Sequence, residues 1–269
     1  MLPLAHTYVS TKVTGRQTQL LVFGGILPDI SSFSTVIDRS KIHYAPREFY
    51  NYFKTHSPSL IDLAIGVRLH SHIDRGADYY CDNGKIGFAM IEGKKIINQT
   101  KALLDTGNPT GNLINAHHFI EEAVDLMLAE SHPEILITYS KSINNLDLKL
   151  ISKYLSEYLG LTKQTVLNEL HSFISYLSPE NLSSAKRVVQ YLAAPLLKIR
   201  YQKEIDQALA LQIIEKTKEN IKDRYLGWLN NAVANMKIDF ADLLHQPAFE
   251  GKAFGTGGQI EISSDFGDP

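Results

Sequence analysis

The stretch LHSHIDRGADYY, residues 69–80, places two histidines and two aspartates close together. If one helix covers this stretch, His70 and Asp74 lie one turn apart on its apolar face, whereas His72 faces water. An ionised carboxylate on a buried face is unfavourable unless it is paired or binds a cation. A divalent metal ion held by His70 and Asp74 would satisfy this requirement, and a hydrogen bond between the two side chains inside a core is the alternative.

The segment GNLINAHHFIEEAVDLMLAE, residues 111–130, repeats the pattern. On a helix, His117, Glu121 and Asp125 form a narrow polar stripe, His118 lies at its edge, and the remaining surface is apolar. Such a stripe inside a helical bundle is typical of a metal site, although a buried hydrogen-bond network would have the same composition. Because two segments of the chain carry histidine and carboxylate on an apolar face, the sequence favours a metal site.

Three candidates come from outside these helices. His6 lies in PLAHTYVS, Asp29 follows a proline in GILPDI, and His56 precedes the first candidate helix in KTHSPSL. The proline turn places the Asp29 carboxylate at the end of an apolar segment, although an aspartate there is also a common helix cap. His56 could join a metal site or only close its loop. The other histidines lack such neighbours, and we expect ordinary roles for His43, His132, His171 and His245.

The chain is expected to be all-α. Stretches rich in Leu, Ile, Ala, Lys and Glu alternate with short breaks that contain Gly and Pro, and the alternation typical of strands is scarce. We therefore predict a multi-helix bundle with the metal site buried inside it. Helices are expected at 45–55, 59–78, 86–105, 112–131, 147–158, 163–178, 182–199 and 202–234.

The candidate metal ligands and the amphipathic packing helices occupy different parts of the chain. The ionisable clusters all precede residue 130, and the sequence after about residue 145 has the pattern of helices with apolar inner and charged outer faces. We predict a metal-binding helical core at 1–140, a helical extension packed on it at 141–250, and a flexible Gly-rich tail at 251–269. Chemistry is expected in the first half.

Composition and charge exclude several classes of protein. The formal net charge of -2 and the absence of long basic runs argue against a broad nucleic-acid surface. The single cysteine, Cys81, cannot form an internal disulfide or a thiolate cluster, so a metal site should use nitrogen and oxygen ligands. The sequence shows no signal-peptide pattern and no apolar run of membrane-spanning length, and a cytoplasmic protein without a membrane span is expected.

The order of these motifs resembles the zinc-dependent phospholipase C family and the related P1-type nucleases. An early histidine is followed by GGILPD, a loop histidine, GVRLHSHID and HHFIEEAVD, all within about the first 130 residues. The resemblance implies an all-α scaffold, Zn²⁺ or a similar divalent ion, and hydrolysis of phosphate esters. It also implies that Asp74 bridges two ions. The metal ligands implied are His6, Asp29, His56, His70, Asp74, His117 and Glu121.

The chain departs from this family in one respect and resembles a second family in another. Secreted members of the phospholipase family bind metal through an N-terminal tryptophan, whereas the only tryptophan here is Trp228, so we expect one or two ions and not three. The segment GVRLHSHIDRGAD is also similar to the acyl-carrier-protein phosphodiesterase family, in which a second aspartate, here Asp78, follows the His-x-x-x-Asp pair. Both resemblances imply a metal-dependent phosphoesterase.

The functional expectation is a metal-dependent phosphoesterase that activates water. A bound ion would lower the pKa of a water towards neutrality and neutralise charge on the phosphoryl oxygens, with Asp29 and Asp74 as the catalytic carboxylates. The alternative is a metal-stapled helical module without catalysis, whose long C-terminal helices bind a partner protein. The expected substrate is a phosphate ester, and the sequence selects neither a particular ester nor an oligomeric state.

Overall fold

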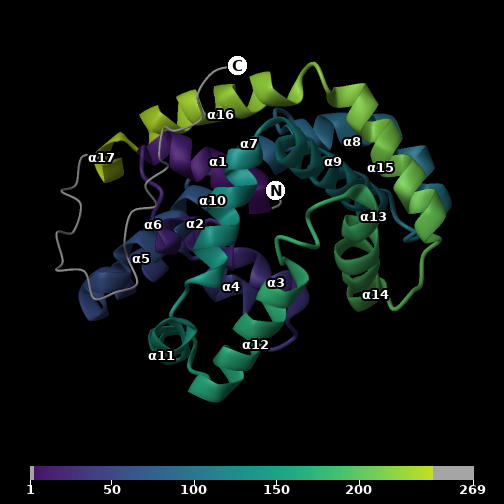
Figure 1. Cartoon of the computed structure of the whole chain (residues 1–269). Coiled ribbons are helices and arrows are strands. Elements are labelled where there is room, and N and C mark those ends of the chain that lie inside the picture. The colour runs from purple at the N-terminus through teal and green to yellow at the C-terminus, as the bar shows by residue number, and fades with distance from the viewer. Residues whose placement is uncertain (1–2, 245–269) are drawn as a thin grey trace.

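The computed structural model describes residues 3–244, and within this range all of its regular elements are helices (Figure 1). The all-α prediction is therefore confirmed. No helix among these residues combines the length and the apolar character that crossing a membrane requires. The first helices, up to residue 144, are α1 (Pro3–Thr14), α2 (Gln19–Gly24), η1 (Leu27–Asp29), α3 (Ile30–Phe33), α4 (Arg39–Ile42), α5 (Pro46–His56), η2 (Pro58–Leu60), α6 (Ile61–His70), α7 (Ala77–Asp82), α8 (Phe88–Leu103), α9 (Pro109–Ser131) and α10 (Pro133–Asn144).

The second part of the chain adds a helical hairpin at 148–176, a helical segment at 185–201 and two outer helices within 207–239 (Figure 1). The predicted tail at 251–269 and His245 lie outside the described residues, and the boundary near residue 140 stays a prediction. The elements of this part are α11 (Leu148–Leu159), α12 (Lys163–Tyr176), α13 (Ala185–Val188), η3 (Val189–Ala193), α14 (Ala194–Tyr201), α15 (Gln207–Ile221), α16 (Tyr225–Asp239) and α17 (Ala241–Leu244).

Helix α1 lies at the centre of the molecule and is buried on nearly all sides (Figure 1). It packs against α2, α6, α9, α10 and α16, so it presents no continuous polar face to water. A helix that is surrounded in this way lacks the one-sided periodicity by which an amphipathic helix is recognised. This explains why α1 was not among the predicted helices, although nearly all of its residues are buried.

Helices α2 and α6 approach each other closely at two glycines. A Cβ atom on Gly66 would lie 2.5 Å from the carbonyl oxygen of Leu21, and one on Gly24 would lie 2.9 Å from the carbonyl carbon of Leu63. Only glycine permits such an approach of two backbones. The contact holds the end of α2 against α6, and the Gly25 carbonyl thereby reaches His70 at the end of α6.

The predicted helix 59–78 is wrong because the chain turns after His70. Helix α6 ends at this residue, Arg75 has a positive φ of 61°, and α7 begins at Ala77. A Cβ on Gly76 would lie 2.9 Å from the Ser71 nitrogen, so this turn also requires glycine. The consequence is that Asp74 and Asp78 do not share a helix with His70.

The later helices pack on the earlier ones, and side-chain caps mark the starts of α11, α12, α13 and α15. Asp147 accepts a hydrogen bond from the Leu150 amide at 2.9 Å, and Thr162 accepts one from Thr165 at 3.1 Å, which fixes the starts of α11 and α12. Gly160, with a φ of 74°, ends α11 in the left-handed conformation. Helices α11, α12 and α14 contact α5 or α3, and α15 contacts α8 and α9.

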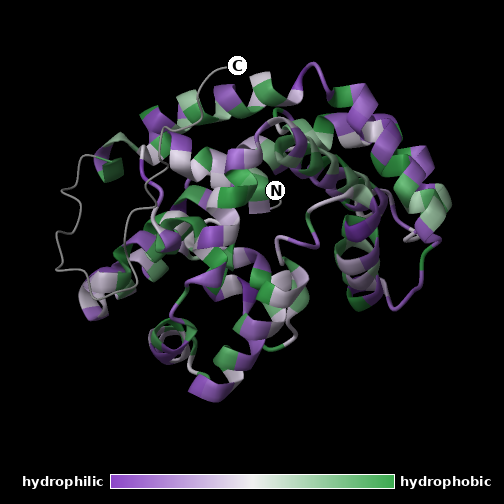
Figure 2. Ribbon diagram, in the orientation of Figure 1, coloured by the Kyte–Doolittle hydropathy of each residue, from purple (hydrophilic) through white to green (hydrophobic). Residues whose placement is uncertain are grey.

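The predicted segments 182–199 and 202–234 are each divided in the structure. The first contains η3, a π-helical turn, between α13 and α14. The second forms α15 and α16, and the turn between them places Arg224 in an ion pair with Glu92 of α8. Hydrophilic and hydrophobic residues alternate along the outer helices α12, α15 and α16 (Figure 2), as expected for amphipathic helices that cover a core.

The close approach of α2 and α6 can be tested by adding a single methyl group. We expect Gly66→Ala to lower the free energy of unfolding by about 1–3 kcal/mol, because the new Cβ must displace the backbone of α2. The matched control is Gly227→Ala in α16, where a Cβ meets no atom within 4 Å. The free energy of unfolding of that variant should be about 0.5–1 kcal/mol higher than that of the parent. Urea denaturation measures both values, and a Gly66→Ala protein as stable as the parent would contradict the contact.

Candidate metal centre

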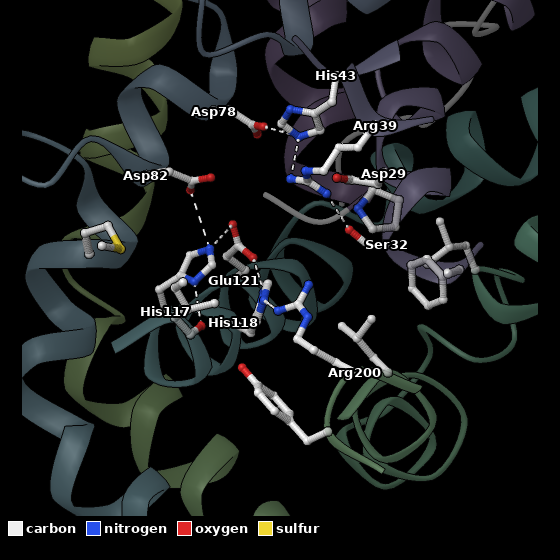
Figure 3. A pocket seen from close by; sticks show the side chains of 17 residues that line it. Asp29, Ser32, Arg39, His43, Asp78, Asp82, His117, His118, Glu121 and Arg200 are labelled. Atoms are coloured by element: carbon white, nitrogen blue, oxygen red, sulfur yellow. Dashed lines mark hydrogen bonds and ion pairs between the residues drawn. The ribbon is translucent and has the colours of Figure 1, made fainter. Parts of the chain in front are cut away.

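One pocket of about 360 Å³ is lined by histidine, carboxylate and arginine side chains (Figure 3). Two groups of residues meet there. The first cluster comes from α1, η1, α6, α7 and the residue after α4, and it consists of His6, Asp29, His43, His70 and Asp78. The second cluster comes from α7 and α9, and it consists of Asp82, His117, His118 and Glu121.

The carboxylate of Asp78 is the centre of the first cluster. The Nε2 atoms of three histidines lie near its two oxygens, at 3.4 Å for His6, 3.3 Å for His43 and 3.0 Å for His70. Asp29 lies on the pocket side of the cluster, with one oxygen 3.7 Å from the His70 Nε2, whereas His6 and His70 are fully buried and do not line the pocket. Within 4.8 Å of one another, these atoms form two overlapping donor sets that share His70, one with His6 and Asp78 and one with Asp29 and His43.

The ring of His70 is oriented by the backbone of α2. Its Nδ1 lies 2.9 Å from the Gly25 carbonyl oxygen, which can only accept a hydrogen bond, so Nδ1 carries the proton. In the neutral ring Nε2 then has its lone pair directed at Asp78. A carboxylate oxygen and an imidazole lone pair repel each other unless a proton or a metal ion lies between them. The same second contact to a carbonyl is characteristic of metal-binding histidines.

His6 lies beside His70 in the interior of the first cluster. It is fully buried, and neither ring nitrogen has a hydrogen bond of normal geometry in the described part of the protein. Its ring stacks on that of His70 with centroids 4.2 Å apart. Burial, together with the charge of His70, lowers the pKa of His6 to about 4. A neutral, buried imidazole aimed at a carboxylate is the state in which histidine binds metal.

Glu121 occupies the same central place in the second cluster. One of its oxygens is 3.4 Å from the His117 Nε2, and the other is 3.1 Å from the His118 Nδ1. His117 Nδ1 lies 2.6 Å from the Ile114 carbonyl oxygen, which directs its Nε2 at Glu121 and at Asp82, 3.6 Å away. His117 therefore repeats the arrangement of His70: one nitrogen bonded to a backbone carbonyl and the other facing carboxylates.

The two adjacent histidines of α9 carry different charges. Burial alone would lower the pKa of His117, but Glu121 and Asp82 outweigh it and raise the pKa to about 9. For His118, burial and the charge of His117 lower the pKa to about 3. His117 and His118 hold the pKa of Glu121 well below its ordinary range, against the effect of burial. In the absence of an ion, a proton on His117 balances the buried carboxylate.

Helix α7 joins the two clusters. Asp78 and Asp82 are four residues apart, so their side chains project from one face of this helix, one into each cluster (Figure 3). Cys81 lies beside them, and its thiol donates to Glu121 at 3.2 Å. Burial raises the pKa of Cys81 well above its usual range, so the sulfur is a protonated donor here. The expectation of nitrogen and oxygen ligands stays a prediction, and the protonated Cys81 thiol is a hydrogen-bond donor beside the second cluster.

Asp74 is held outside both clusters. The Nε of Arg47 lies 2.6 Å from one of its oxygens, and the Nε of Arg68 lies 2.7 Å from the other. Both lone-pair regions that a metal ion would need are engaged by guanidinium groups. The sequence correctly identified a buried carboxylate that required a cation, but the cation is arginine. Asp78, noted only through the second resemblance, occupies the place that was predicted for Asp74.

His56 also lies apart from the clusters. It is exposed at the end of α5, its Nδ1 is 2.9 Å from the Tyr52 carbonyl oxygen, and its ring stacks on Tyr52. In its place His43, for which an ordinary role was expected, reaches Asp78. No periodic pattern identifies His43 in the sequence, because this residue follows the four-residue helix α4 and owes its position to tertiary packing.

Asp125, the last residue of the predicted stripe, has a structural partner. Its two oxygens accept hydrogen bonds from the backbone amides of Leu4 and Ala5, each at 2.8 Å. These amides belong to the first turn of α1, where backbone N–H groups lack partners within the helix. Asp125 therefore caps α1 from α9 and anchors the first turn of α1, which carries His6.

The chain matches no protein-family model, and no curated protein or solved structure was found to match it.

Metal content distinguishes the two aspartates that follow α6. We expect Asp78→Asn to lose at least one zinc ion per chain, because the amide removes the charge on which three imidazoles converge. Asp74→Asn should keep the parent's zinc content and only lower the melting temperature, since it weakens two arginine contacts. Elemental analysis after zinc loading and desalting measures the content, with His56→Ala as the neutral control. Zinc loss in Asp74→Asn with retention in Asp78→Asn would contradict this site.

Proposed function

We propose that this protein is a metal-dependent hydrolase of phosphate esters, with one or two divalent ions bound by the first and second clusters. The observation that supports the proposal is the convergence of two histidine and carboxylate clusters on one pocket, joined through Asp78 and Asp82 of α7. The nitrogen and oxygen donors suit Zn²⁺, and other divalent transition metals accept the same ligands. We also propose that the protein acts in the cytoplasm, as the sequence led us to expect.

The imidazole nitrogens and carboxylates of the two clusters are arranged in a way that suits a metal ion between them better than direct contact. The Nε2 atoms of His70 and His117 both face carboxylates, and each ring has its other nitrogen bonded to a backbone carbonyl. Without an ion, each of these pairs needs a proton on Nε2, and the raised pKa values of both histidines express that need. An ion would replace this proton and bind the lone pair that the carbonyl has already oriented.

Divalent ions at this place would lower the pKa of a water molecule and neutralise charge on phosphoryl oxygens. The protein supplies the remaining functions. Asp78 is buried among three imidazoles and serves to hold an ion. Asp29 lines the pocket with 22% of its side chain exposed, and it is the carboxylate of the first cluster best placed to take the proton of a water in the pocket. Asp29 thus keeps the catalytic role that the sequence suggested, whereas the role suggested for Asp74 passes to Asp78.

The proposal is tested by metal removal and restoration. We expect the chelated protein to be inactive on p-nitrophenyl phosphate and bis-p-nitrophenyl phosphate, and Zn²⁺ or Mn²⁺ to restore hydrolysis of at least one of them. His70→Ala and Glu121→Gln should each lower kcat/KM by ~100-fold or more, because each removes a ligand from a different cluster. The control is His72→Ala, whose ring packs on Tyr79 outside the clusters.

One result would favour the alternative function. Stoichiometric zinc binding that raises the melting temperature, without hydrolysis of either ester under any divalent metal, is the behaviour of a metal-stapled module. Hydrolysis that persists after chelation and is unchanged in both ligand variants would contradict a metal-dependent mechanism altogether.

A further inference from the structure

Two arginines reach the pocket, one beside each cluster (Figure 3). Arg39 lies next to the first cluster, where one Nη is 3.2 Å from the His43 Nε2 and the other is 3.0 Å from the Ser32 hydroxyl. Arg200 lies next to the second cluster, with its Nη1 2.6 Å from the His118 Nε2. Arg200 comes from α14, which belongs to the part of the chain for which no chemistry was expected.

The contact of Arg200 with His118 fixes which atoms carry protons. A guanidinium group can only donate hydrogen bonds, so the His118 Nε2 accepts and its Nδ1 carries the proton that faces Glu121. A metal ion held between Glu121 and His118 would take the place of this Nδ1 proton, and the His118 Nε2 would then carry the proton. A guanidinium group cannot donate to a protonated nitrogen, so Arg200 would be released beside the second cluster with its donors available to a ligand.

The charges of the pocket lining select the charge of that ligand. Four carboxylates line the pocket, Asp29, Asp78, Asp82 and Glu121, against the two guanidinium groups. Without metal ions the four carboxylates outweigh the two guanidinium groups and the protonated His117, so an anion is disfavoured. Two divalent cations would balance the four carboxylates, and the two guanidinium charges would then remain without a counter-charge. These two positive charges match a phosphate monoester, which carries about two negative charges near neutral pH, better than a diester, which carries one.

The shape of the pocket supports the same choice. A volume of about 360 Å³ lies at the small end of the range for ligand sites, ~300–1,000 Å³. Phe33, Leu177 and Leu196 form an apolar part of its wall. A phosphoryl group with one compact organic substituent fits a pocket of this size. A diester would place a second substituent against the same walls.

We propose that the substrate is a small phosphate monoester, and that Arg200 and Arg39 bind its terminal phosphoryl oxygens. This inference depends on the proposed function, because the two guanidinium groups are released for binding only when metal neutralises the carboxylates. Arg200 is a substrate-binding residue in this proposal, and its planar fork of donors matches two oxygens of one phosphoryl group.

Binding of inorganic phosphate tests the proposal without turnover. Isothermal titration calorimetry of the zinc-loaded parent should show one phosphate per chain, and the chelated protein should show none. Arg200→Gln should weaken phosphate binding by ~10- to 100-fold while retaining the parent's zinc content, because a charge-assisted pair of hydrogen bonds is lost. Arg39→Gln should act in the same direction. The matched control is Arg187→Gln in α13, whose guanidinium pairs with Glu180 outside the pocket.

Kinetics on the two esters completes the test. The parent should have the higher kcat/KM for p-nitrophenyl phosphate, and Arg200→Gln should reduce that value by ~10-fold or more, with a smaller effect on bis-p-nitrophenyl phosphate. Arg200→Lys, which keeps the charge without the fork, should fall between the parent and Arg200→Gln.

The outcomes separate this inference from the proposed function. A parent that prefers the diester, or an Arg200→Gln protein with unchanged phosphate affinity, overturns the monoester assignment while metal-dependent hydrolysis stands. An absence of metal-dependent hydrolysis of both esters overturns the proposed function and the inference with it.

Discussion

Two buried carboxylates, Asp78 and Glu121, constrain the arrangement of every helix around the pocket. A carboxylate removed from water is strongly unfavourable unless positive charge and hydrogen-bond donors surround it, and breaking a buried pair of this kind typically costs about 3–5 kcal/mol. Their partners come from α1, α6, α9 and the residue that follows α4. The helices that supply these imidazoles therefore have to meet at one place, and α7 has to end between them.

The backbone meets this requirement with close contacts and caps. Gly24 and Gly66 allow α2 to lie against α6, so that a carbonyl of α2 orients His70. Asp125 anchors the first turn of α1 on α9. Each of these contacts is remote from the pocket centre, yet each fixes the direction of an imidazole. The rigidity of the candidate site thus comes from ordinary helix packing, which is the condition for a ligand set that is formed before an ion arrives.

The sequence predicted the helical class and half of the site, and the physical reason for each success or failure is local. His70, His117 and Glu121 lie on long helices, where periodicity identifies the buried face. His43 follows a very short helix and Asp82 ends another, and periodicity carries no information over so few residues.

Asp74 was misplaced because the turn at 71–76 is imposed by Gly76 and by a left-handed Arg75. An isolated glycine in a helical pattern does not by itself end a helix. Arg200 was missed because its partner, His118, lies 82 residues away along the chain.

The π-helical turn η3 makes the place of Arg200 depend on the local winding of one helix. A π turn accommodates one residue more than the α-helix around it, so each residue that follows lies about 100° and about 1.5 Å behind its place in an uninterrupted helix of the same sequence. Helix α14 begins directly after this turn and carries Arg200. Rewinding residues 189–193 into α-helix would carry Arg200 around the axis and direct it away from His118, whereas loss of one residue there would remove the π turn and leave Arg200 in place. A substitution that rewinds the turn would thus remove the second guanidinium group from the pocket in one evolutionary step, with the candidate metal ligands left intact.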